Sequence, residues 1–219
     1  MNRIQRSSML GKFGERRAPT RDPKPRIIIF SEGDVTERMY FEGLAKLVGN
    51  RLVEIQVVGG RGATVKLVGA AIAHKGLLDV AAMKSLDSFE NQFEVWAVMD
   101  VDEHPKLPEA QSLAKKNSVR LGLSNPCFEL WLLYHCEDCN KPWDRHELQK
   151  YLSKKVKSYN DKSGKKIEFS DVAKGLGQAM KLAKQGLKRR IEERSPNGNP
   201  SSTVVNLVER IVSLGKYKA

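Results

Sequence analysis

The sequence predicts an α/β fold in which helices flank a parallel sheet. Four short apolar runs, at residues 26–31, 53–58, 93–99 and 119–123, have the length of strands, and the first is a row of β-branched residues without polar alternation. Between the runs lie segments whose apolar residues recur at helical spacing. Strands that alternate with helices over roughly 100 residues are typical of a parallel sheet with helices on both faces.

The first strand is expected at residues 26–31, because Arg-Ile-Ile-Ile-Phe-Ser suits a chain that is buried on both faces. Gly33 then opens a turn, and a helix is expected to begin at Thr36. The inward face of this helix is predicted from apolar residues at helical spacing, namely Met39, Tyr40, Leu44, Leu47 and Val48.

The second strand is expected at residues 53–58 and is closed by a glycine-rich loop at 59–62. A helix is predicted over residues 63–75, where apolar side chains cluster again. Residues 76–92 predict further helix with a break.

The third strand is expected at residues 93–99, and the prolines that follow it stop the strand. Pro108 suits the first turn of a helix over residues 109–117. Residues 119–123 predict a fourth, short strand.

After Pro126 the pattern changes to helices alone. Residues 128–134 are almost continuously apolar and predict a buried helix, and Asp144 is placed to cap a helix that runs to Leu152. Residues 154–166 are strongly charged and predict a loop.

One long amphipathic helix is predicted over residues 172–191, with lysines on its outer face. After a turn at residues 195–200, Ser201 or Ser202 is expected to cap a last helix, which Gly215 ends. The second half of the chain therefore predicts a helical extension.

These patterns divide the chain into three segments. Residues 1–25 are basic, have no sustained periodicity and predict a flexible basic arm. Residues 26–136 predict the α/β core. Residues 137–219 predict a basic helical extension packed on that core.

The chain is strongly basic. It has 38 Lys and Arg against 26 Asp and Glu, a formal net charge of +12 and a sequence pI near 9.6. An excess of this size indicates DNA or RNA as a partner, with a solvated lysine-rich surface as the alternative. No apolar run approaches the ~20 residues that span a bilayer, no secretory signal is visible, and the 3 cysteines cannot all pair. We expect a cytoplasmic protein with no membrane partner.

Acidic residues follow two of the predicted strands. Glu32 comes directly after the first strand, and Asp100 and Asp102 come after the third. Ligands of open α/β sheets bind beyond the carboxyl ends of the strands, so the three carboxylates could meet there as a site for Mg²⁺ or Mn²⁺. The alternative is that each cluster only caps the next helix or faces water.

Two further acids are candidate metal ligands. Glu37 lies one turn into the helix after Glu32, where an acid is also favourable for the helix itself. Glu129 stands inside an apolar helix, where a charge is costly unless it is paired or binds a metal. A glutamate at the rim of the helix is the alternative.

A structural zinc site is not favoured. Cys136 and Cys139 have the spacing of zinc ligands and His146 is nearby, but no second pair of ligands follows at the right spacing. The role of the two cysteines is left open.

Several basic residues are candidate nucleic-acid ligands that would contact the phosphate backbone without reading sequence. Arg61 lies in the glycine-rich loop, which lacks the residues of a P-loop or of a dinucleotide fingerprint and also suits a plain turn. The others lie in the second half of the chain: Lys154, Lys155, Lys157, Lys181, Lys184, Lys188 and Arg189.

With these residues in view, the chain resembles the RloB-like family of Toprim-fold predicted nucleases from restriction-modification and abortive-infection loci. The resemblance rests on four segments: FSEGDVTE at residues 30–37, VWAVMDVDEH at 95–104, SNPCFELWLL at 124–133 and NPSSTVV at 199–205. It implies a Toprim-like Rossmannoid core and a role in prokaryotic anti-phage defence, with an ABC- or AAA-type ATPase as a partner and a homo-oligomer as an option.

The same resemblance implies roles for the acids. Glu32 would act as an acid/base or metal ligand, Asp100 and Asp102 as metal ligands, and Glu37 and Glu129 as additional ligands. We therefore expect a metal-dependent nuclease that hydrolyses DNA or RNA. The alternatives are strand or nucleotidyl transfer at the same site, and a non-catalytic nucleic-acid-binding or regulatory subunit of a defence system.

Overall fold

The structure is a computed structural model that describes residues 24–58, 64–85, 91–101, 106–162 and 164–216. Most of the expected basic arm, residues 1–25, lies outside the described residues, as does the glycine-rich loop at 59–62. No helix of the described segments is long and apolar enough to cross a membrane.

A five-stranded sheet forms the centre of the fold, with the strand order β2-β1-β3-β4-β5. Four strands are parallel: β1 (Arg26–Ser31), β2 (Val53–Val57), β3 (Phe93–Asp100) and β4 (Arg120–Asn125). The predicted α/β class, with a mostly parallel sheet flanked by helices, is confirmed.

The fifth strand corrects one expectation. Ser201 and Ser202 do not cap the last helix but form β5 (Ser201–Ser202), which pairs antiparallel with the end of β4. The Ser124 and Ser202 hydroxyls lie 2.8 Å apart across this pair. A strand of two residues has no periodicity from which it could be predicted.

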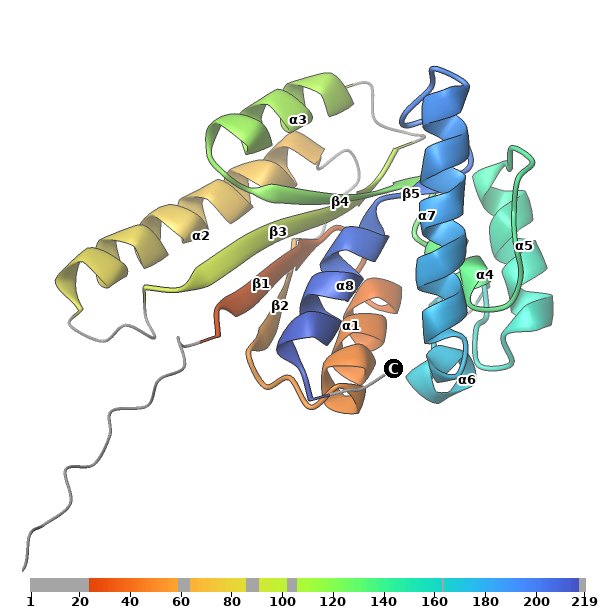
Figure 1. Ribbon diagram of the computed structural model, residues 1–219, viewed down its shortest axis with the longest axis horizontal. Coiled ribbons are helices and arrows are strands. Elements are labelled where there is room, and N and C mark those ends of the chain that lie inside the picture. The colour runs from red at the N-terminus through yellow and green to blue at the C-terminus, as the bar shows by residue number, and fades with distance from the viewer. Residues whose placement is uncertain (1–23, 59–63, 86–90, 102–105, 163, 217–219) are drawn as a thin grey trace, which may run out of the picture.

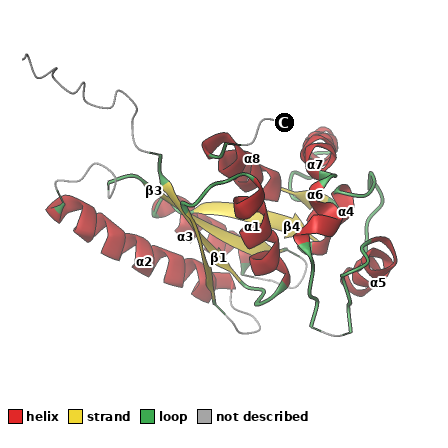
Figure 2. Ribbon diagram, turned by 90° about the horizontal axis from the view of Figure 1, so that it is seen from below, coloured by secondary structure: helices red, strands yellow, loops and turns green. Residues whose placement is uncertain are grey.

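Helices cover both faces of the sheet, as Figures 1 and 2 show. On one face lie α2 (Thr64–Lys84) and α3 (Leu107–Lys116); on the other lie α1 (Thr36–Leu47) and α8 (Val204–Leu214). In β1, Ile27 and Ile29 pack on the α1 side while Ile28 and Phe30 pack on the α2 side, and all four are buried. The unbroken apolar run follows from this two-sided burial.

Four helices gather beyond the β5 edge of the sheet (Figure 1). They are α4 (Glu129–Tyr134), α5 (Arg145–Lys155), α6 (Phe169–Ala173) and α7 (Leu176–Glu192). Asp144 caps α5 as predicted, because its carboxylate accepts from the N–H groups of His146 and Glu147. The segment expected as a helical extension thus supplies β5 to the sheet, α8 to the layer over one face of the sheet, and α5, α6 and α7 beyond the sheet edge.

The helix predicted over residues 63–75 continues to Lys84, because Ile72 and Leu78 keep packing on the apolar cluster over the sheet. Residues 86–90 of the further helix expected over 76–92 lie outside the described residues. The single long helix predicted over residues 172–191 is wrong, because Lys174 and Gly175 divide this segment into α6 and α7. Lys154 and Lys155, expected in a loop, are the last residues of α5.

A buried histidine joins α1, α4 and α6. The Nδ1 of His135 lies 2.8 Å from the Val172 carbonyl oxygen, and its Nε2 lies 3.1 Å from the Tyr40 hydroxyl. Burial lowers the pKa of His135 to about 4, so the ring is uncharged at neutral pH, where Nδ1–H donates and Nε2 accepts. The ring thereby fixes α6 against α1.

The break between α6 and α7 lies where Gly175 passes close to the backbone of His135. A Cβ at Gly175 would stand 2.1 Å from the carbonyl oxygen of His135, so only glycine allows the chain to pass this backbone. We expect Gly175→Ala to lower the free energy of unfolding by about 1–3 kcal/mol, the usual cost of forcing an extra carbon into a packed site. Urea denaturation followed by circular dichroism measures this loss.

Gly177→Ala is the matched control, because a Cβ at this exposed position of α7 meets nothing within 4 Å. It should leave stability unchanged or raise it by up to about 1 kcal/mol. Equal stabilities for the two variants would contradict the contact between Gly175 and His135.

Candidate active site

A pocket of about 370 Å³ lies at the carboxyl ends of β1 and β3. Its walls come from the turn after β1, the start of α1, the end of β3, α4, the start of α5 and the loop before α6. The charged residues that line it are Glu32, Asp34, Glu37, Asp100, Glu129, Asp161, Arg145 and Lys165. Acids outnumber bases here in a chain that is basic as a whole.

The pairing of two strands explains why acids distant in sequence meet. β1 and β3 are neighbours in parallel register, with Ser31 opposite Val98. Glu32 follows the last residue of β1, and Asp100 is the last residue of β3. Both acids line the same pocket.

Asp100 is held by two donors. Its Oδ1 accepts the Phe128 N–H at 2.9 Å, and its Oδ2 accepts from Nη2 of Arg145 at 2.7 Å. The side chains of Asp100 and Arg145 are only 19% and 17% exposed. Burial, followed by the charges of Glu37 and Glu129, raises the pKa of Asp100 well above its usual range, and Arg145 offsets part of this rise.

Glu37 is the other strongly perturbed carboxyl. Burial and then the charge of Glu129 raise its pKa to about 7, while Lys165 acts in the opposite direction. Its carboxylate lies against Gly33, where a Cβ would stand 1.9 Å from Oε2 of Glu37. The glycine after Glu32 thus makes room for the acid of the next helix.

Glu129 is buried, and its side chain is 5% exposed. Its Oε1 accepts from the Tyr159 hydroxyl at 2.6 Å and from Nε2 of Gln149 at 3.2 Å, and Nζ of Lys165 lies 3.9 Å away. Burial and the charge of Glu129 raise the pKa of Tyr159, which therefore remains a hydrogen-bond donor. The cost of a charge inside an apolar helix is offset by these donors.

Several residues of this site were not predicted from the sequence, namely Arg145, Gln149, Tyr159 and Lys165. They come from α5 and the loop after it, which carry no local pattern that indicates the contact. The loop is tied to the start of α1, because the Thr36 hydroxyl donates to the Lys165 carbonyl oxygen at 2.6 Å. The pocket is thus assembled from both halves of the chain.

The structure brings four of the five predicted metal ligands to one pocket: Glu32, Glu37, Asp100 and Glu129. Asp102 lies outside the described residues, as does Arg61. The four acids in the pocket offer only carboxylate oxygens as ligand atoms, which suits a hard cation such as Mg²⁺ or Mn²⁺. Within the described ranges, however, no three His, Cys, Asp or Glu side chains are grouped so that they could already hold a metal ion.

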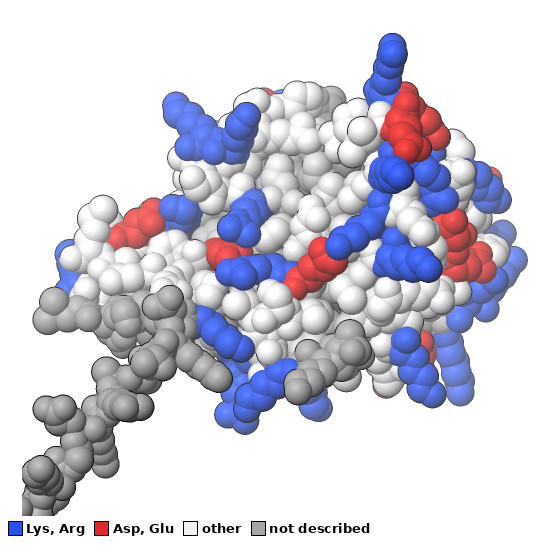
Figure 3. Space-filling view, in the orientation of Figure 1, with Lys and Arg blue, Asp and Glu red and all other residues white. Residues whose placement is uncertain are grey.

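The predicted nucleic-acid ligands of the second half fall into two groups. Some are paired with acids: Lys155 with Glu137, Lys184 with Glu209, Lys188 with Glu192 at 3.8 Å, and Arg189 with Asp138. Figure 3, in which α7 faces the viewer, shows acidic side chains beside the basic ones at this end of the molecule. The remainder are exposed, with Lys154 and Lys157 on a second hollow and Lys181 on α7.

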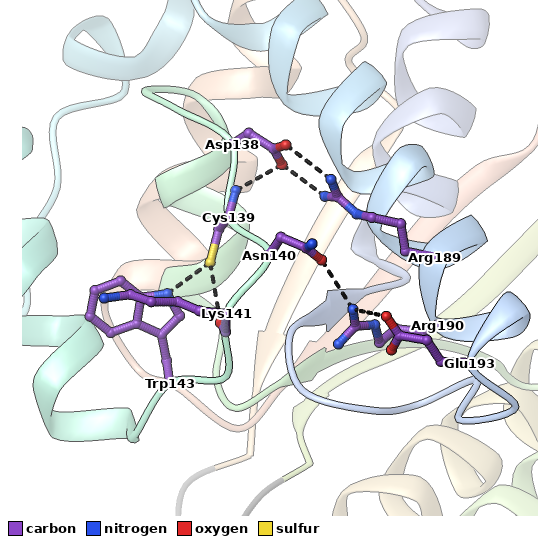
Figure 4. A network of polar contacts seen from close by, with 8 residues as sticks. All are labelled: Asp138, Cys139, Asn140, Lys141, Trp143, Arg189, Arg190 and Glu193. Carbon is purple, nitrogen blue, oxygen red and sulfur yellow. Dashed lines mark hydrogen bonds and ion pairs between the residues drawn. The ribbon is translucent and has the colours of Figure 1, made fainter.

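Arg189 makes a two-point contact that Figure 4 shows in detail. Its Nη1 and Nη2 donate to the two carboxylate oxygens of Asp138 at 3.0 and 2.8 Å. Next to it, Arg190 donates to the side chains of Asn140 and Glu193. The two arginines fix α7 to the loop after α4, so Arg189 has a structural partner that the sequence did not reveal.

The cysteine pair is divided between two environments. Cys136 is exposed. Cys139 is buried, and its Sγ lies 2.7 Å from Nε1 of Trp143, which donates to it (Figure 4). The thiol of Cys139 is thus part of the packing around Trp143.

Comparison with known proteins gives one match. A family model described as "RloB-like protein" matches residues 27–211, which include the pocket and, apart from Arg26, the five strands. No curated protein and no solved structure matches the chain.

Glu37 makes the stability of the fold depend on pH. A glutamate ionises near pH 4.5 in the unfolded chain, whereas Glu37 keeps its proton up to about pH 7 in the folded chain. The folded state binds more protons between these values, so the free energy of unfolding falls as the pH rises from about 5 to 8. Glu37→Gln should reduce this fall by at most about 3 kcal/mol. Urea denaturation at the two pH values measures it, and parallel profiles would contradict the shift.

Gly33→Ala tests the same carboxylate by a different route. The new methyl group would occupy the place of the flexible Glu37 carboxylate, which should turn out of the pocket without unfolding the protein. We expect stability at pH 5 to change by less than about 1 kcal/mol and the pH dependence to decrease as in Glu37→Gln. Gly69→Ala, where a Cβ meets nothing within 4 Å, is the control and should keep the wild-type profile.

Proposed function

The chain belongs to the RloB-like protein family, and on this premise we propose that it is a divalent-metal-dependent nuclease that hydrolyses DNA or RNA. The observation that supports the proposal most is an acidic pocket at the carboxyl edge of the sheet, in a chain with a net charge of +12. Such a pocket suits a cation, and the basic surface around it suits a polyanion.

The metal ligands in this proposal are Glu32, Asp100 and Asp102, with Glu37 and Glu129 beside them. Mutual repulsion contributes to the raised pKa values of Glu37 and Asp100, and a divalent cation would relieve it. When bound, Mg²⁺ or Mn²⁺ would polarise the scissile phosphate and activate an attacking water.

The chain's own cations and acids supply the other functions. Arg145 and Lys165 line the pocket, and each can donate to a phosphoryl oxygen. Arg145 now holds Oδ2 of Asp100, so it would turn from this oxygen toward the substrate. A cation bound beside Glu37 would lower its pKa from about 7, so that Glu37 would act as an ionised ligand at neutral pH.

The resemblance also supports a biological setting for this activity. We propose a Toprim-type core that acts in prokaryotic anti-phage defence, with an ABC- or AAA-type ATPase as a partner and with self-association as an option. These assignments extend the family membership and depend on it.

One observation favours a second candidate function, a non-catalytic nucleic-acid-binding or regulatory subunit. Both oxygens of Asp100 are already occupied by protein donors, and the described residues hold no ready group of three metal ligands. In that case the acids would serve only the fold. Calorimetry separates the two functions, because the subunit would bind no Mg²⁺ or Mn²⁺ while retaining salt-sensitive affinity for nucleic acid.

We expect cleavage of nucleic acid to require Mg²⁺ or Mn²⁺, to stop on chelation and to fall ~100-fold or more in Glu32→Gln and in Asp100→Asn, which lose metal ligands. Digestion of labelled DNA and RNA pools, resolved on gels, measures this. Asp79→Asn is the control, because Asp79 pairs with Lys75 on α2, away from the pocket. Undiminished cleavage by either site variant would refute the assignment.

A further inference from the structure

A second hollow lies next to the acidic pocket. Its volume is about 660 Å³, and it is formed by the last turns of α5 and the loop that follows. Five lysines line it, together with the single acid Asp161: Lys150, Lys154, Lys157, Lys162 and Lys166. The hollow is therefore basic, whereas the pocket beside it is acidic.

The lysines of this hollow differ from three other lysines in the second half of the chain. Lys155, Lys184 and Lys188 are each paired with a glutamate. None of the five lysines of the hollow forms an ion pair with an acid in the described parts of the chain. Their positive charge is available to a ligand.

The two concave sites are neighbours. Asp161 lines both of them. Tyr159 lines the hollow, and its hydroxyl donates to Glu129, which lines the pocket. A linear polyanion bound at one site would therefore lie close to the other.

The loop after α5, which carries Lys157, Lys162 and Lys166, has hydrogen bonds that hold its described residues in place. The Lys162 and Lys165 N–H groups both donate to Asn160, and the Glu168 N–H donates to the Ser158 hydroxyl. The Thr36 hydroxyl anchors the loop to α1 through the Lys165 carbonyl oxygen. A loop that is already positioned loses less entropy when it binds a ligand.

We propose that this lysine hollow binds the phosphate backbone of the nucleic acid beside the phosphodiester that is cleaved in the acidic pocket. Ammonium groups contact phosphates as point charges and do not read bases, so this contact would be independent of sequence. The inference rests on the proposed nuclease function. It assigns the substrate path to α5 and its loop rather than to α7, whose cations are largely neutralised.

The test measures binding without cleavage. Fluorescence anisotropy with labelled single- and double-stranded DNA and RNA in EDTA gives the affinity over a range of NaCl concentrations. Lys154→Gln/Lys157→Gln and Lys162→Gln/Lys166→Gln should each weaken binding at low salt by ~10-fold or more, and each should reduce the slope of log affinity against log salt by about 1.4 for a single strand.

Lys115→Gln/Lys116→Gln is the matched control, because it removes two charges from the last turn of α3, on another part of the molecule. It should keep affinity and salt slope within about twofold of wild type. Thermal unfolding of all variants should match wild type, since the substituted lysines are exposed.

Three results would overturn the inference: wild-type affinity in both hollow variants, a larger loss in Lys181→Gln/Lys188→Gln on α7, or binding to anionic lipid vesicles in place of nucleic acid. The nuclease function fails separately. If the hollow variants lose binding but wild-type protein never cleaves with Mg²⁺ or Mn²⁺, the binding role of the lysine hollow is supported and the nuclease function is refuted.

Discussion

The crowding of carboxylates at one edge of the sheet is the constraint on which the rest of the site depends. Direct pairing of β1 with β3 delivers Glu32 and Asp100 to the same edge, and α1 and α4 add Glu37 and Glu129. Buried like charges are unfavourable, and the raised pKa values of Glu37 and Asp100 reflect this cost. Residues of α5 and the loop after it offset part of this cost. Arg145 donates to Asp100, and Nζ of Lys165 lies 3.9 Å from Glu129. Tyr159 and Gln149 donate hydrogen bonds to Glu129. The α5 segment and its loop are thus positioned by the acids that they neutralise.

The sequence predicted those parts of the fold that local patterns encode. The strands β1 and β3 are apolar runs buried by helices on both faces, and Asp144 caps α5 through its own short-range hydrogen bonds. The errors occur where a distant segment decides the structure. The break between α6 and α7 follows from the carbonyl of His135, and β5 exists only because β4 is there to pair with it. Neither contact can be predicted from the periodicity of apolar residues in the local sequence.

The candidate site was predictable to a similar extent. The positions of Glu32 and Asp100 follow from the rule that strand ends meet at one edge, and Glu129 stood out as a charge in an apolar helix. The cations of the pocket could not be predicted, because Arg145 and Lys165 become neighbours of these acids only through the packing of α5 and its loop. A count of charges likewise cannot tell a free lysine from a paired one. Arg189 was expected to contact nucleic acid, yet it forms a two-point contact with Asp138.

The hydrogen bond between Thr36 and Lys165 joins residues that are 129 positions apart. During synthesis on a ribosome, the acids from Glu32 to Glu129 emerge before Arg145 and Lys165 do, and β5 and α8 emerge later still. A nascent chain therefore carries its negative cluster for some time without the cations that balance it. The pocket can form only after Lys165 has emerged, and a product truncated before this residue would lack part of the lining.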